Sequence, residues 1–549
     1  MRLRKSVRFP KSLLLVILFG FALRLASIDF QSLWRDEVDS AGYGDPRLRL
    51  GDVLATGDFD RLKGVFTQPG LNGPLYYLAL QQWTHLASDT GFALRFPSAF
   101  FGTLVIPLTY VVAKRLLSTR TQRNTDEHRS DSRSVSSVQI HVPSLAAWLV
   151  AISPYFVWYS QEAKMYTETA ALALVAIYAL RRATAPPVSP SQSRGSARGG
   201  KWWTLVIVAT TVAIYSHILA ALLIGVEVVL FLLWWPYSKP HVRGGLIALA
   251  ALTLPYLPLA VWQIKLAITP GDQGHTFYAF DAMLRVMMVG FANGVLPFDA
   301  TLNALGIRLP AEAIPPALNP SSWGAWLLGL LAVIGTLMWK DAADRGNRLG
   351  LAAWVILPTA SVALVSLNRP VFSDRYLIWI GPAVYVLAAL GISEVWMWRR
   401  VAGGAAIALV SLIAVLGVIA QAITPFKPDF RSAASFVAAR YRGEAIVFQI
   451  PYGRYNFDYY FAPPFRMIDG PYTNHRNADG TYLNDTATSE AHIAAALSGQ
   501  TAVWLVASEV ETWDDRHLLE DWLKRYARET DRGEFMRVAV VRYEIQVDK

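Results

Sequence analysis

Residues 142–182 read VPSLAAWLVAISPYFVWYSQEAKMYTETAALALVAIYALRR, in which two apolar runs enclose the polar stretch QEAK at 161–164. Apolar runs of about 18 or more residues recur along the chain, and each is long enough to cross roughly 30 Å of hydrocarbon. The chain has 549 residues, of which 53% are hydrophobic and only 17% are charged. These features predict a polytopic α-helical membrane protein.

The apolar runs predict eleven membrane spans with short loops between them. Their approximate bounds are 11–28, 92–116, 142–160, 165–182, 202–218, 219–236, 243–262, 322–339, 349–367, 376–397 and 402–423. Arg24 interrupts the first run and no small-residue cleavage site follows it, so we interpret this run as an uncleaved anchor and not as a signal peptide.

The basic residues indicate which loops face the cytoplasm. The N-terminus, MRLRKSVRFPK, is basic, and every second loop contains Lys or Arg: 117–141, 183–201, 237–242, 340–348 and 398–401. By the positive-inside rule these segments are cytoplasmic, and residues 29–91 and those after 424 are extracytoplasmic. The net charge of +10 therefore reflects orientation in the membrane and does not indicate a nucleic-acid partner.

Residues 425–549 have a different pattern, which predicts a small extracytoplasmic α/β domain beyond a membrane domain at 1–424. Apolar strands at 444–450, 465–469, 501–509 and 536–545 alternate with amphipathic helices at 430–443, 492–499 and 514–529. The chain has no cysteine, which excludes disulfides, a thiol nucleophile and cysteine metal ligands.

Ionisable and polar residues gather where the predicted spans meet the outer face. Such groups are costly at a membrane unless they face a cavity or a partner. They are Arg35, Asp36, Glu37 and Asp39 after the first span, Arg95 at the second, Gln161, Glu162 and Lys164 after the third, His217 at the end of the fifth, and Asp374 and Arg375 at the tenth. We expect these residues to line one cavity. The alternative is that Arg95, Lys164 and Arg375 only extend their charges towards the interface.

This set of residues suggests transfer from a lipid-linked phosphate. A carboxylate can act as general base on an acceptor hydroxyl or amine. Arginine or lysine can hold a phosphate and stabilise its charge as it leaves. Tyr76 and Tyr77, in the first outer loop at 29–91, are expected either at this cavity or in an aromatic interface belt.

Five segments carry a family resemblance. They are SLWRDE (32–37), NGPLYYL (72–78), RFPSAFFGTL (95–104), SPYFVWYSQEAKMYT (153–167) and SDRYL (373–377). Together, over residues 11–424, the chain resembles the GT-C glycosyltransferases, in the bacterial branch related to protein O-mannosyltransferases and to the lipid A aminoarabinose transferase. The resemblance implies a polyprenyl-phosphate sugar donor and an inverting transfer on the outer face of the plasma membrane.

The resemblance also implies roles for individual residues. Asp36, with its neighbour Glu37, matches the loop carboxylate that acts as base or orients the acceptor. Lys164 stands where the family usually has Arg, and with Arg375 and Arg95 it is expected to bind the donor phosphate. The remaining residues expected at the substrate cavity are Gln161, Glu162, Tyr76, Tyr376 and His217.

The first-loop motif departs from the family pattern. The family often has His-Pro-Pro-Leu-Tyr-Tyr, whereas this chain has Asn72-Gly73-Pro74-Leu75-Tyr76-Tyr77. The motif histidine is therefore missing, and use of a divalent metal stays open, with His217 and Glu162 as candidate ligands. No other cofactor is expected.

Three alternatives to this interpretation remain. A transporter or flippase would handle lipid-linked or small polar substrates, but such proteins tend to show repeated halves and polar groups near the midplane. A non-catalytic lipid-binding scaffold would not need Asp36 and Glu37. An oligosaccharyltransferase or polymerising ligase would stay within the family. The sugar is not identified, and protein, lipid and glycan acceptors are all open.

Overall fold

A computed structural model describes residues 10–42, 72–127, 140–184, 197–269, 276–308, 319–477 and 479–545. The chain forms two compact units. The first, here called the helical unit, comprises Met1–Ser27, Val53–Ala79 and Arg95–Thr424. The second, here called the sheet unit, comprises Ile28–Asp52, Leu80–Leu94 and Pro425–Lys549. Of the predicted outer loop 29–91, the described parts are 29–42 and 72–91.

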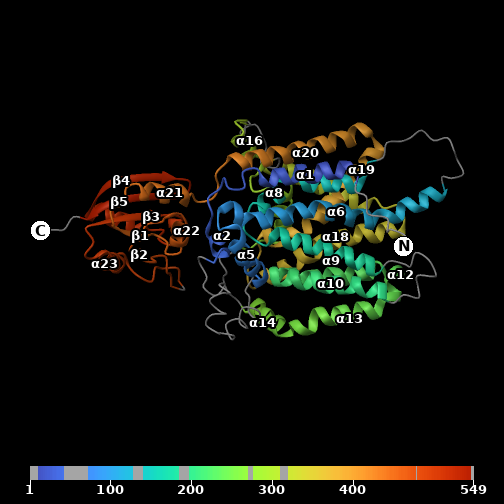
Figure 1. Cartoon of the computed structure of the whole chain (residues 1–549), viewed down its shortest axis with the longest axis horizontal. Helices are drawn as coiled ribbons and strands as arrows, with labels where there is room; N and C mark the ends of the chain where they lie inside the picture. The colour runs from blue at the N-terminus through green and yellow to red at the C-terminus, as the bar shows by residue number, and fades with distance from the viewer. Residues whose placement is uncertain are drawn as a thin grey trace. The chain divides into compact units, whose positions relative to one another are not determined.

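Long helices run alongside one another in the helical unit (Figure 1). They are α1 (Lys11–Leu25), α6 (Gly91–Glu127), α7 (Val142–Ile152), α8 (Pro154–Ser160), α9 (Tyr166–Ala183), α10 (Ala197–Ser216), α11 (Leu222–Leu233), α13 (Val242–Thr253), α14 (Leu257–Ile268), α15 (Phe280–Asn293), α16 (Phe298–Ala304), α17 (Trp323–Leu337), α18 (Ala342–Ser366), α19 (Gly381–Trp398) and α20 (Arg400–Ile423). Each of the eleven predicted spans falls mainly on one of these helices or on two in succession.

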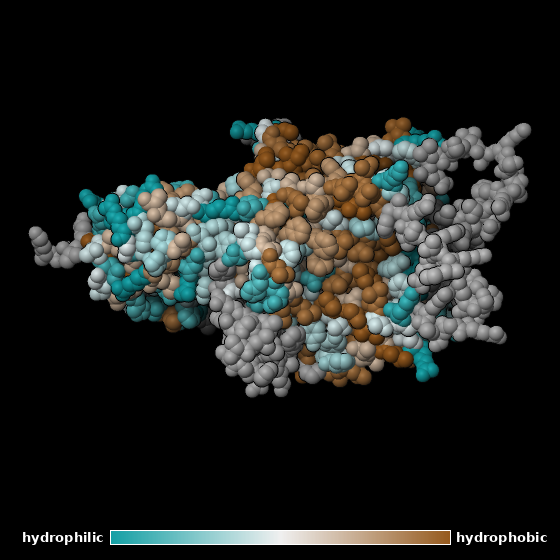
Figure 2. All heavy atoms as spheres, in the orientation of Figure 1, coloured by the Kyte–Doolittle hydropathy of each residue, from teal (hydrophilic) through white to brown (hydrophobic). Residues whose placement is uncertain are grey.

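Five described helical segments are long and apolar enough to cross a membrane: Gly91–Leu117, Pro320–Leu337, Ala342–Ser366, Asp374–Trp398 and Arg400–Ile423. Two bent pairs raise the number to seven, one bent by 55° between α7 and α8 and one by 86° between α11 and the helices that follow it. Hydrophobic side chains cover the helices in the space-filling view (Figure 2). The chain is thus a multi-span membrane protein, and the count of eleven stays a prediction.

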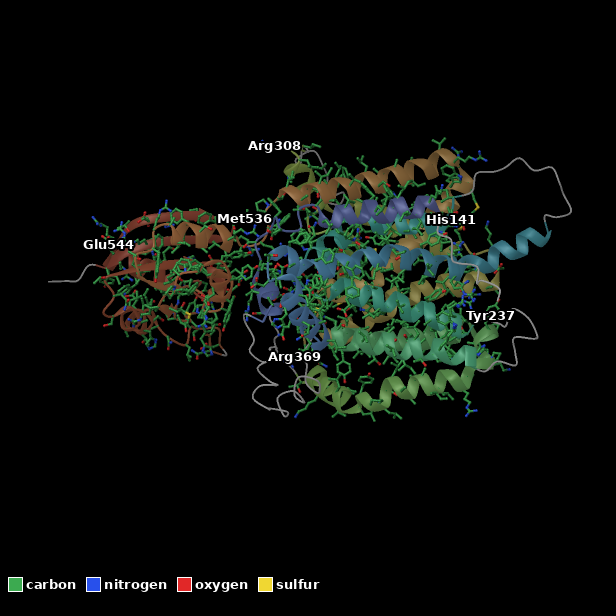
Figure 3. All side chains as sticks on the ribbon, viewed as in Figure 1. His141, Tyr237, Arg308, Arg369, Met536 and Glu544 are labelled. Carbon is green, nitrogen blue, oxygen red and sulfur yellow. The ribbon has the colours of Figure 1, made fainter. Side chains whose placement is uncertain are left out.

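The two ends of the helical unit match the predicted alternation of loops. His141 and Tyr237, from segments predicted to be cytoplasmic, lie at one end of the unit (Figure 3). Arg308 and Arg369, from segments predicted to be extracytoplasmic, lie at the other end (Figure 3). The predicted orientation of these ends in the membrane stays a prediction.

Arg24 is wholly buried in α1 and stabilises the bend between α7 and α8. Its guanidinium donates to the carbonyls of Val150 (3.1 Å), Ala151 (3.1 Å) and Gly20 (2.7 Å). In a continuous helix the Val150 carbonyl would accept from residue 154, but Pro154 has no N–H. Arg24 therefore supplies the donor that proline removes, which explains a charged residue inside an apolar run.

Helices α17 and α19 approach each other closely through glycines. A Cβ atom on Gly335 would lie 1.9 Å from the Leu387 carbonyl oxygen, and one on Gly391 would lie 1.9 Å from that of Leu331. Small residues at such contacts let membrane helices pack backbone to backbone. Helix α19, which is almost wholly buried, follows the 3₁₀ helix η10 (Asp374–Ile380), so this contact fixes the segment that carries Arg375.

The sheet unit contains one five-stranded sheet in the order β2-β1-β3-β5-β4. Its strands are β1 (Ala445–Phe448), β2 (Met467–Asp469), β3 (Ala502–Ala507), β4 (Ala527–Phe535) and β5 (Val538–Ile545). Strand β1 is parallel to both β2 and β3, whereas β5 is antiparallel to β3 and to β4.

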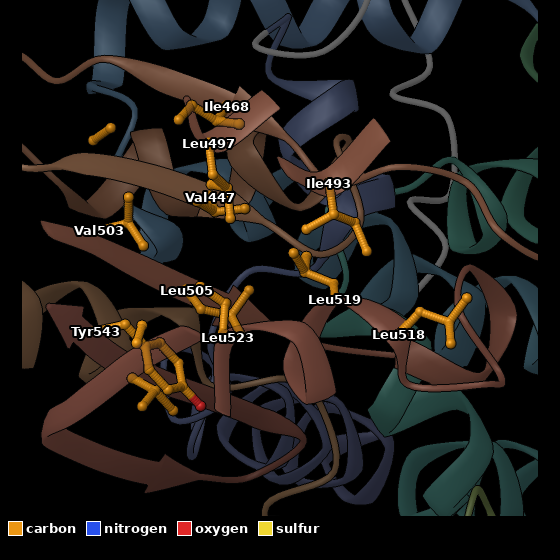
Figure 4. Close-up of a cluster of buried hydrophobic side chains, with 13 residues drawn as sticks. Val447, Ile468, Ile493, Leu497, Val503, Leu505, Leu518, Leu519, Leu523 and Tyr543 are labelled. Carbon is orange, nitrogen blue, oxygen red and sulfur yellow. The ribbon is translucent and has the colours of Figure 1, made fainter. Parts of the chain in front are cut away.

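Helices cover both faces of this sheet because side chains alternate along each strand. Val447 and Leu505 point to the face covered by α23 (Thr486–Leu497) and α24 (Leu518–Tyr526) (Figure 4). Ile446 and Trp504 point to the opposite face, where they meet α21 (Phe430–Ala438) and α22 (Gly453–Tyr460).

The sequence pattern was wrong at two places in this unit. The helix predicted at 514–529 is shorter, because α24 ends at Tyr526 and Ala527–Phe535 form β4. This strand is at the edge of the sheet and mostly exposed, so it lacks the apolar run on which the strand prediction depended. Helix α22 was also missed, since GRYNFDYY is rich in aromatic residues and short.

We expect Arg24→Met to destabilise the helical unit. The substitution keeps an apolar chain of similar length but leaves the carbonyls of Val150 and Ala151 without their donor, at a cost of about 1–3 kcal/mol. The thermal unfolding midpoint in detergent should fall. The midpoint of Arg24→Lys should fall less, because the lysine side chain still supplies a donor. The control is Arg182→Met, an exposed arginine that stacks on Trp202. Equal midpoints for Arg24→Met and Arg182→Met would contradict the role assigned to Arg24.

Candidate functional site

Lys164 lies in the turn between α8 and α9 and contacts two other motif segments. Only 3% of the residue is exposed. Its Nζ donates to the Tyr77 hydroxyl at 3.2 Å and lies 5.2 Å from the centre of that ring. Ser98 Oγ donates to the Lys164 carbonyl at 2.8 Å and is 3.0 Å from the Tyr76 hydroxyl. The segments NGPLYYL, RFPS and QEAK, far apart in sequence, therefore meet at one point.

The NGP segment is docked against the C-terminal end of α10. Asn72 and His217 form an antiparallel β-bridge, and the Gly73 N–H donates to the Ser216 carbonyl at 3.0 Å. A Cβ atom on Gly73 would lie 1.9 Å from the Tyr215 carbonyl oxygen, so only glycine fits. The motif lacks the histidine usual in its family, but a histidine from another segment, His217, lies beside its first residue.

His217 is 1% exposed, and neither of its ring nitrogens has a hydrogen-bond partner among the described residues. Its ring centre is 4.9 Å from that of Tyr376 and 6.3 Å from that of Tyr166. Lys164 and Arg375 both act on it electrostatically. A neutral imidazole has one N–H donor, so the buried His217 ring has a donor available for an added anionic group.

Arg375 and Tyr376 open η10, the segment fixed by α19. The Arg375 guanidinium carbon lies 6.0 Å from the Tyr166 ring centre and 5.6 Å from that of Tyr376. Contact with aromatic faces helps to hold the guanidinium in place, and the neighbouring Asp374 carboxylate also acts on it electrostatically. Lys164, Arg375 and His217, which we call the cation cluster, are therefore surrounded by tyrosines, an arrangement suited to an anion such as phosphate.

The other predicted residues of the helical unit are placed less directly. Arg95 is fully buried on α6, and Glu162 is 3% exposed beside Lys164 in sequence. Gln161 donates from its side-chain amide to the carbonyls of Ala26 (2.5 Å) and Arg24 (3.2 Å), and so satisfies the C-terminal end of α1. In this contact Gln161 stabilises the end of a helix, and its predicted place at the substrate cavity stays a prediction.

Asp36 and Glu37 lie in the first turn of α2 (Arg35–Ser40), in the sheet unit. Glu37 is fully buried, and its Oε2 accepts from Lys427 Nζ at 2.9 Å and from the Trp34 N–H at 3.4 Å. Asp36 is half-buried and lines a pocket of about 130 Å³. The two adjacent carboxylates thus have different surroundings, one in an ion pair and one at a pocket.

The pocket beside Asp36 is formed by residues that sequence reasoning missed. They include Trp34, Tyr452, Asn456, Ser508 and Glu509. Burial, and then the nearby Glu509 carboxylate, raises the pKa of Tyr452 above its ordinary value, so its hydroxyl stays protonated. The signal that could have located this pocket is the pair of predicted strands at 444–450 and 501–509, because Tyr452, Ser508 and Glu509 lie at or just after their carboxyl ends.

The expectation that all the polar residues line one cavity stays a prediction. Asp36 and Glu37 belong to the sheet unit, and the cation cluster belongs to the helical unit. Sequence reasoning also missed Tyr166, Ser98 and Glu168, which accepts from Ser216 Oγ at 3.1 Å. Aromatic and hydroxyl residues at span ends are too common for the sequence to single these out.

Across the described ranges, no group of three or more His, Asp, Glu or Cys side chains could hold a metal ion. His217 and Glu162, the candidate ligands, are therefore not joined by a third residue of that kind there. No step of the chemistry below passes through a metal.

The family model of the protein O-mannosyl-transferase TMEM260 N-terminal domain matches residues 64–241. This range contains the NGPLYYL, RFPS and QEAK segments and His217, but neither Asp36 nor Arg375. No curated protein matches the chain by sequence.

Solved structures match almost the whole chain. The crystal structure of ArnT from Cupriavidus metallidurans bound to undecaprenyl phosphate has a TM-score of 0.51 at 13% identity, covering 96% of this chain and 97% of that one. The oligosaccharyltransferase of Archaeoglobus fulgidus, in complex with Zn and sulfate, has a TM-score of 0.54 at 13% identity, covering 94% of this chain and 71% of that one. The resemblance to the GT-C glycosyltransferases is therefore confirmed, and the chain has the GT-C fold.

Proposed function

We propose that this protein is a membrane glycosyltransferase that moves a sugar from a polyprenyl-phosphate donor to an extracytoplasmic acceptor, with inversion. The observation that carries the proposal is the cation cluster, in which buried Lys164 contacts Tyr77, and Arg375 and buried His217 both contact Tyr376. The ArnT structure with bound undecaprenyl phosphate supports a lipid phosphate as the anion. The protein would lie in the plasma membrane with its N-terminus in the cytoplasm and its C-terminal domain outside.

The cation cluster would hold the donor phosphate. Lys164 and Arg375 would offset the negative charge that the donor phosphate already carries and the second one that develops as the bond to the sugar breaks. His217 can donate a ring N–H to a phosphate oxygen, which would satisfy one of the two nitrogens that lack a partner. The tyrosines around the cluster keep both cations in position.

The transfer would be a single displacement. Asp36 takes the proton from the acceptor hydroxyl or amine as the acceptor atom forms a bond to the anomeric carbon. The bond between that carbon and the phosphate oxygen breaks, and its electron pair stays on the phosphate. Phosphate leaves readily without protonation, so a second carboxylic acid is not required, unlike in glycoside hydrolysis. Glu37, paired with Lys427, would position Asp36 and not react.

An apolar groove in the helical unit supports a lipid-linked donor. It has a volume of about 230 Å³ and is lined by residues of α10, α11 and α13, among them Trp203, Phe231 and Leu249. Leu180, at the far end of α9, also lines it. Leu180 lies 14 residues after Tyr166, or about 21 Å along the helix at 1.5 Å per residue. A prenyl chain that starts at the cation cluster is long enough to reach this groove.

Lys164→Met should lower kcat/KM for the lipid-phosphate sugar by about 100-fold to 1,000-fold, because the substitution removes the positive charge proposed to contact the leaving phosphate. Lys164→Arg, which restores the residue usual in the family, should retain most of the activity. Release of radiolabelled sugar from polyprenyl-phosphate donors in liposomes measures both.

The matched control for Lys164 is Lys201→Met, an exposed lysine on α10 that stacks on Trp202. It should leave the rate unchanged. A folded Lys164→Met protein as active as Lys201→Met would exclude a phosphate contact at Lys164.

Asp36→Asn and Glu37→Gln should fail in different ways. Asp36→Asn removes the proposed base and should lower kcat by about 100-fold to 10,000-fold, with little change in thermal stability. Glu37→Gln breaks a buried ion pair and should destabilise the sheet unit by about 3–5 kcal/mol. Rates in liposomes and unfolding midpoints separate the two effects.

The control is Asp39→Asn, which removes the half-buried carboxylate one turn further along α2. Undiminished transfer by folded Asp36→Asn protein would exclude Asp36 as the base.

A further inference from the structure

The order of strands in the sheet unit creates a crevice at the carboxyl ends of β1 and β3. Strand β1 lies between β2 and β3 and is parallel to both. The chain leaves β1 to form β2 on one side, and then crosses to form β3 on the other side. The connections after β1 and β3 therefore leave the sheet in opposite directions. In open α/β sheets, ligands bind at such a topological switch point, outside the carboxyl ends of the strands.

The pocket beside Asp36 lies at this switch point. Its wall includes Ile450 and Tyr452, which follow β1, and Ser508 and Glu509, which follow β3. The volume of about 130 Å³ is close to the roughly 150 Å³ of a protein cavity that binds benzene, so the pocket can take one six-membered ring. The strand order thus predicts a ligand site where the structure has a pocket that takes one six-membered ring.

The lining combines aromatic walls with hydrogen-bond acceptors. Phe430, Phe448 and Val506 form an apolar part of the pocket. The Tyr452 ring is held by the Arg35 guanidinium, 4.0 Å from its centre, and its hydroxyl is 3.5 Å from Glu509 Oε2. An aromatic side chain fixed in this way offers an apolar surface at little cost in side-chain entropy.

The charges of the pocket select a neutral ligand rich in hydroxyl groups. Glu509 accepts from the Tyr452 hydroxyl and lies 3.9 Å from Arg537. Ionised Asp36 and Glu509 only accept hydrogen bonds, so a ligand group that contacts either carboxylate is a donor. An anionic ligand would be repelled by these carboxylates, and Arg35 at the same pocket disfavours a cationic one. Glu509 also has a left-handed backbone, with φ of 52°, and such strained residues are typical of ligand sites. A sugar has both an apolar C–H face and several hydroxyl donors.

We infer that the pocket at the switch point binds one sugar residue of a glycan or glycolipid acceptor. That the bound sugar belongs to the acceptor rests on the proposed function, because Asp36 is both the proposed base and part of the pocket wall. Sugar binding itself rests only on the sheet unit. A Ser/Thr peptide is the rival acceptor, and the experiment distinguishes it.

The test is binding of a panel of methyl glycosides to the full chain in nanodiscs, measured by saturation-transfer-difference NMR. At least one glycoside should bind the wild type. Tyr452→Ala removes an aromatic wall and Ser508→Leu fills the pocket from the other strand, and each should weaken binding roughly tenfold. The two substitutions lie in segments that follow different strands, so weaker binding by both is not explained by a folding defect in one. The unfolding midpoint of each variant is measured in parallel.

The matched control is Tyr472→Ala, which removes a 45% exposed tyrosine that contacts Trp513 and does not line the pocket. It should bind like the wild type. Binding of no glycoside to the wild type, or equal binding to folded Tyr452→Ala and Ser508→Leu proteins, would overturn the inference.

The donor assay separates this inference from the proposed function. If glycosides bind at the pocket but no polyprenyl-phosphate sugar is consumed in their presence, the sugar site stands and the proposed function fails. If a Ser/Thr peptide is glycosylated while no glycoside binds, the proposed function stands and the sugar site fails. Transfer to a bound glycoside, lost in Tyr452→Ala, would support both.

Discussion

The need to satisfy every backbone carbonyl inside a membrane governs the helical unit, and the clearest case is the break at Pro154. Proline removes the donor for Val150, and Arg24 replaces it from another helix. The helix pair α7 and α8 can therefore bend by 55° without leaving the Val150 carbonyl unpaired. The bend sets the course of α8 and of the turn after it, which carries Lys164. A buried arginine that has no part in the chemistry thus supports a lysine that is proposed to take part in it.

The cation cluster and the pocket beside Asp36 combine different kinds of chemical group. The cation cluster combines positive charge with aromatic rings, and it needs rigid support, which the glycine contacts of α17 and α19 give to Arg375. The pocket beside Asp36 combines carboxylates with an apolar wall at the edge of a parallel sheet. A lipid phosphate suits the first set of groups and a neutral hydroxyl-bearing molecule suits the second. Donor and acceptor would then be distinguished by charge.

Much of the fold could be predicted from the sequence, because membrane helices and parallel strands produce strong apolar patterns. The α/β character of the C-terminal part and most of its strands were predicted from that pattern. Strand β4 could not be, since an exposed edge strand such as ARETDRGEF has few apolar residues. Helix α22 was missed for a similar reason, since its sequence is aromatic and polar on all sides.

The candidate site was predictable in its residues more than in its contacts. Sequence motifs pointed to Lys164 and Arg375, and a position at the end of a predicted span pointed to His217. Arg375 and His217 both contact Tyr376 in the structure. The close approach of Gly73 to Tyr215 is possible because glycine has no side chain. A pattern of polar and apolar residues does not show which backbone segment a glycine contacts. Tyr452 and Glu509 could not be assigned to one pocket before the order of strands was known, because that order determines which loops lie at the same edge of the sheet.

The ion pair between Glu37 and Lys427 joins residues 390 positions apart, and this separation has a consequence for synthesis. A chain emerging from the ribosome contains every member of the cation cluster once Arg375 has been made. The pocket beside Asp36 needs residues as late as Glu509. A nascent chain would therefore be able to capture a lipid phosphate well before it could present an acceptor to it. Glu37 of the early α2 segment acquires its ion-pair partner only after Lys427 has been made.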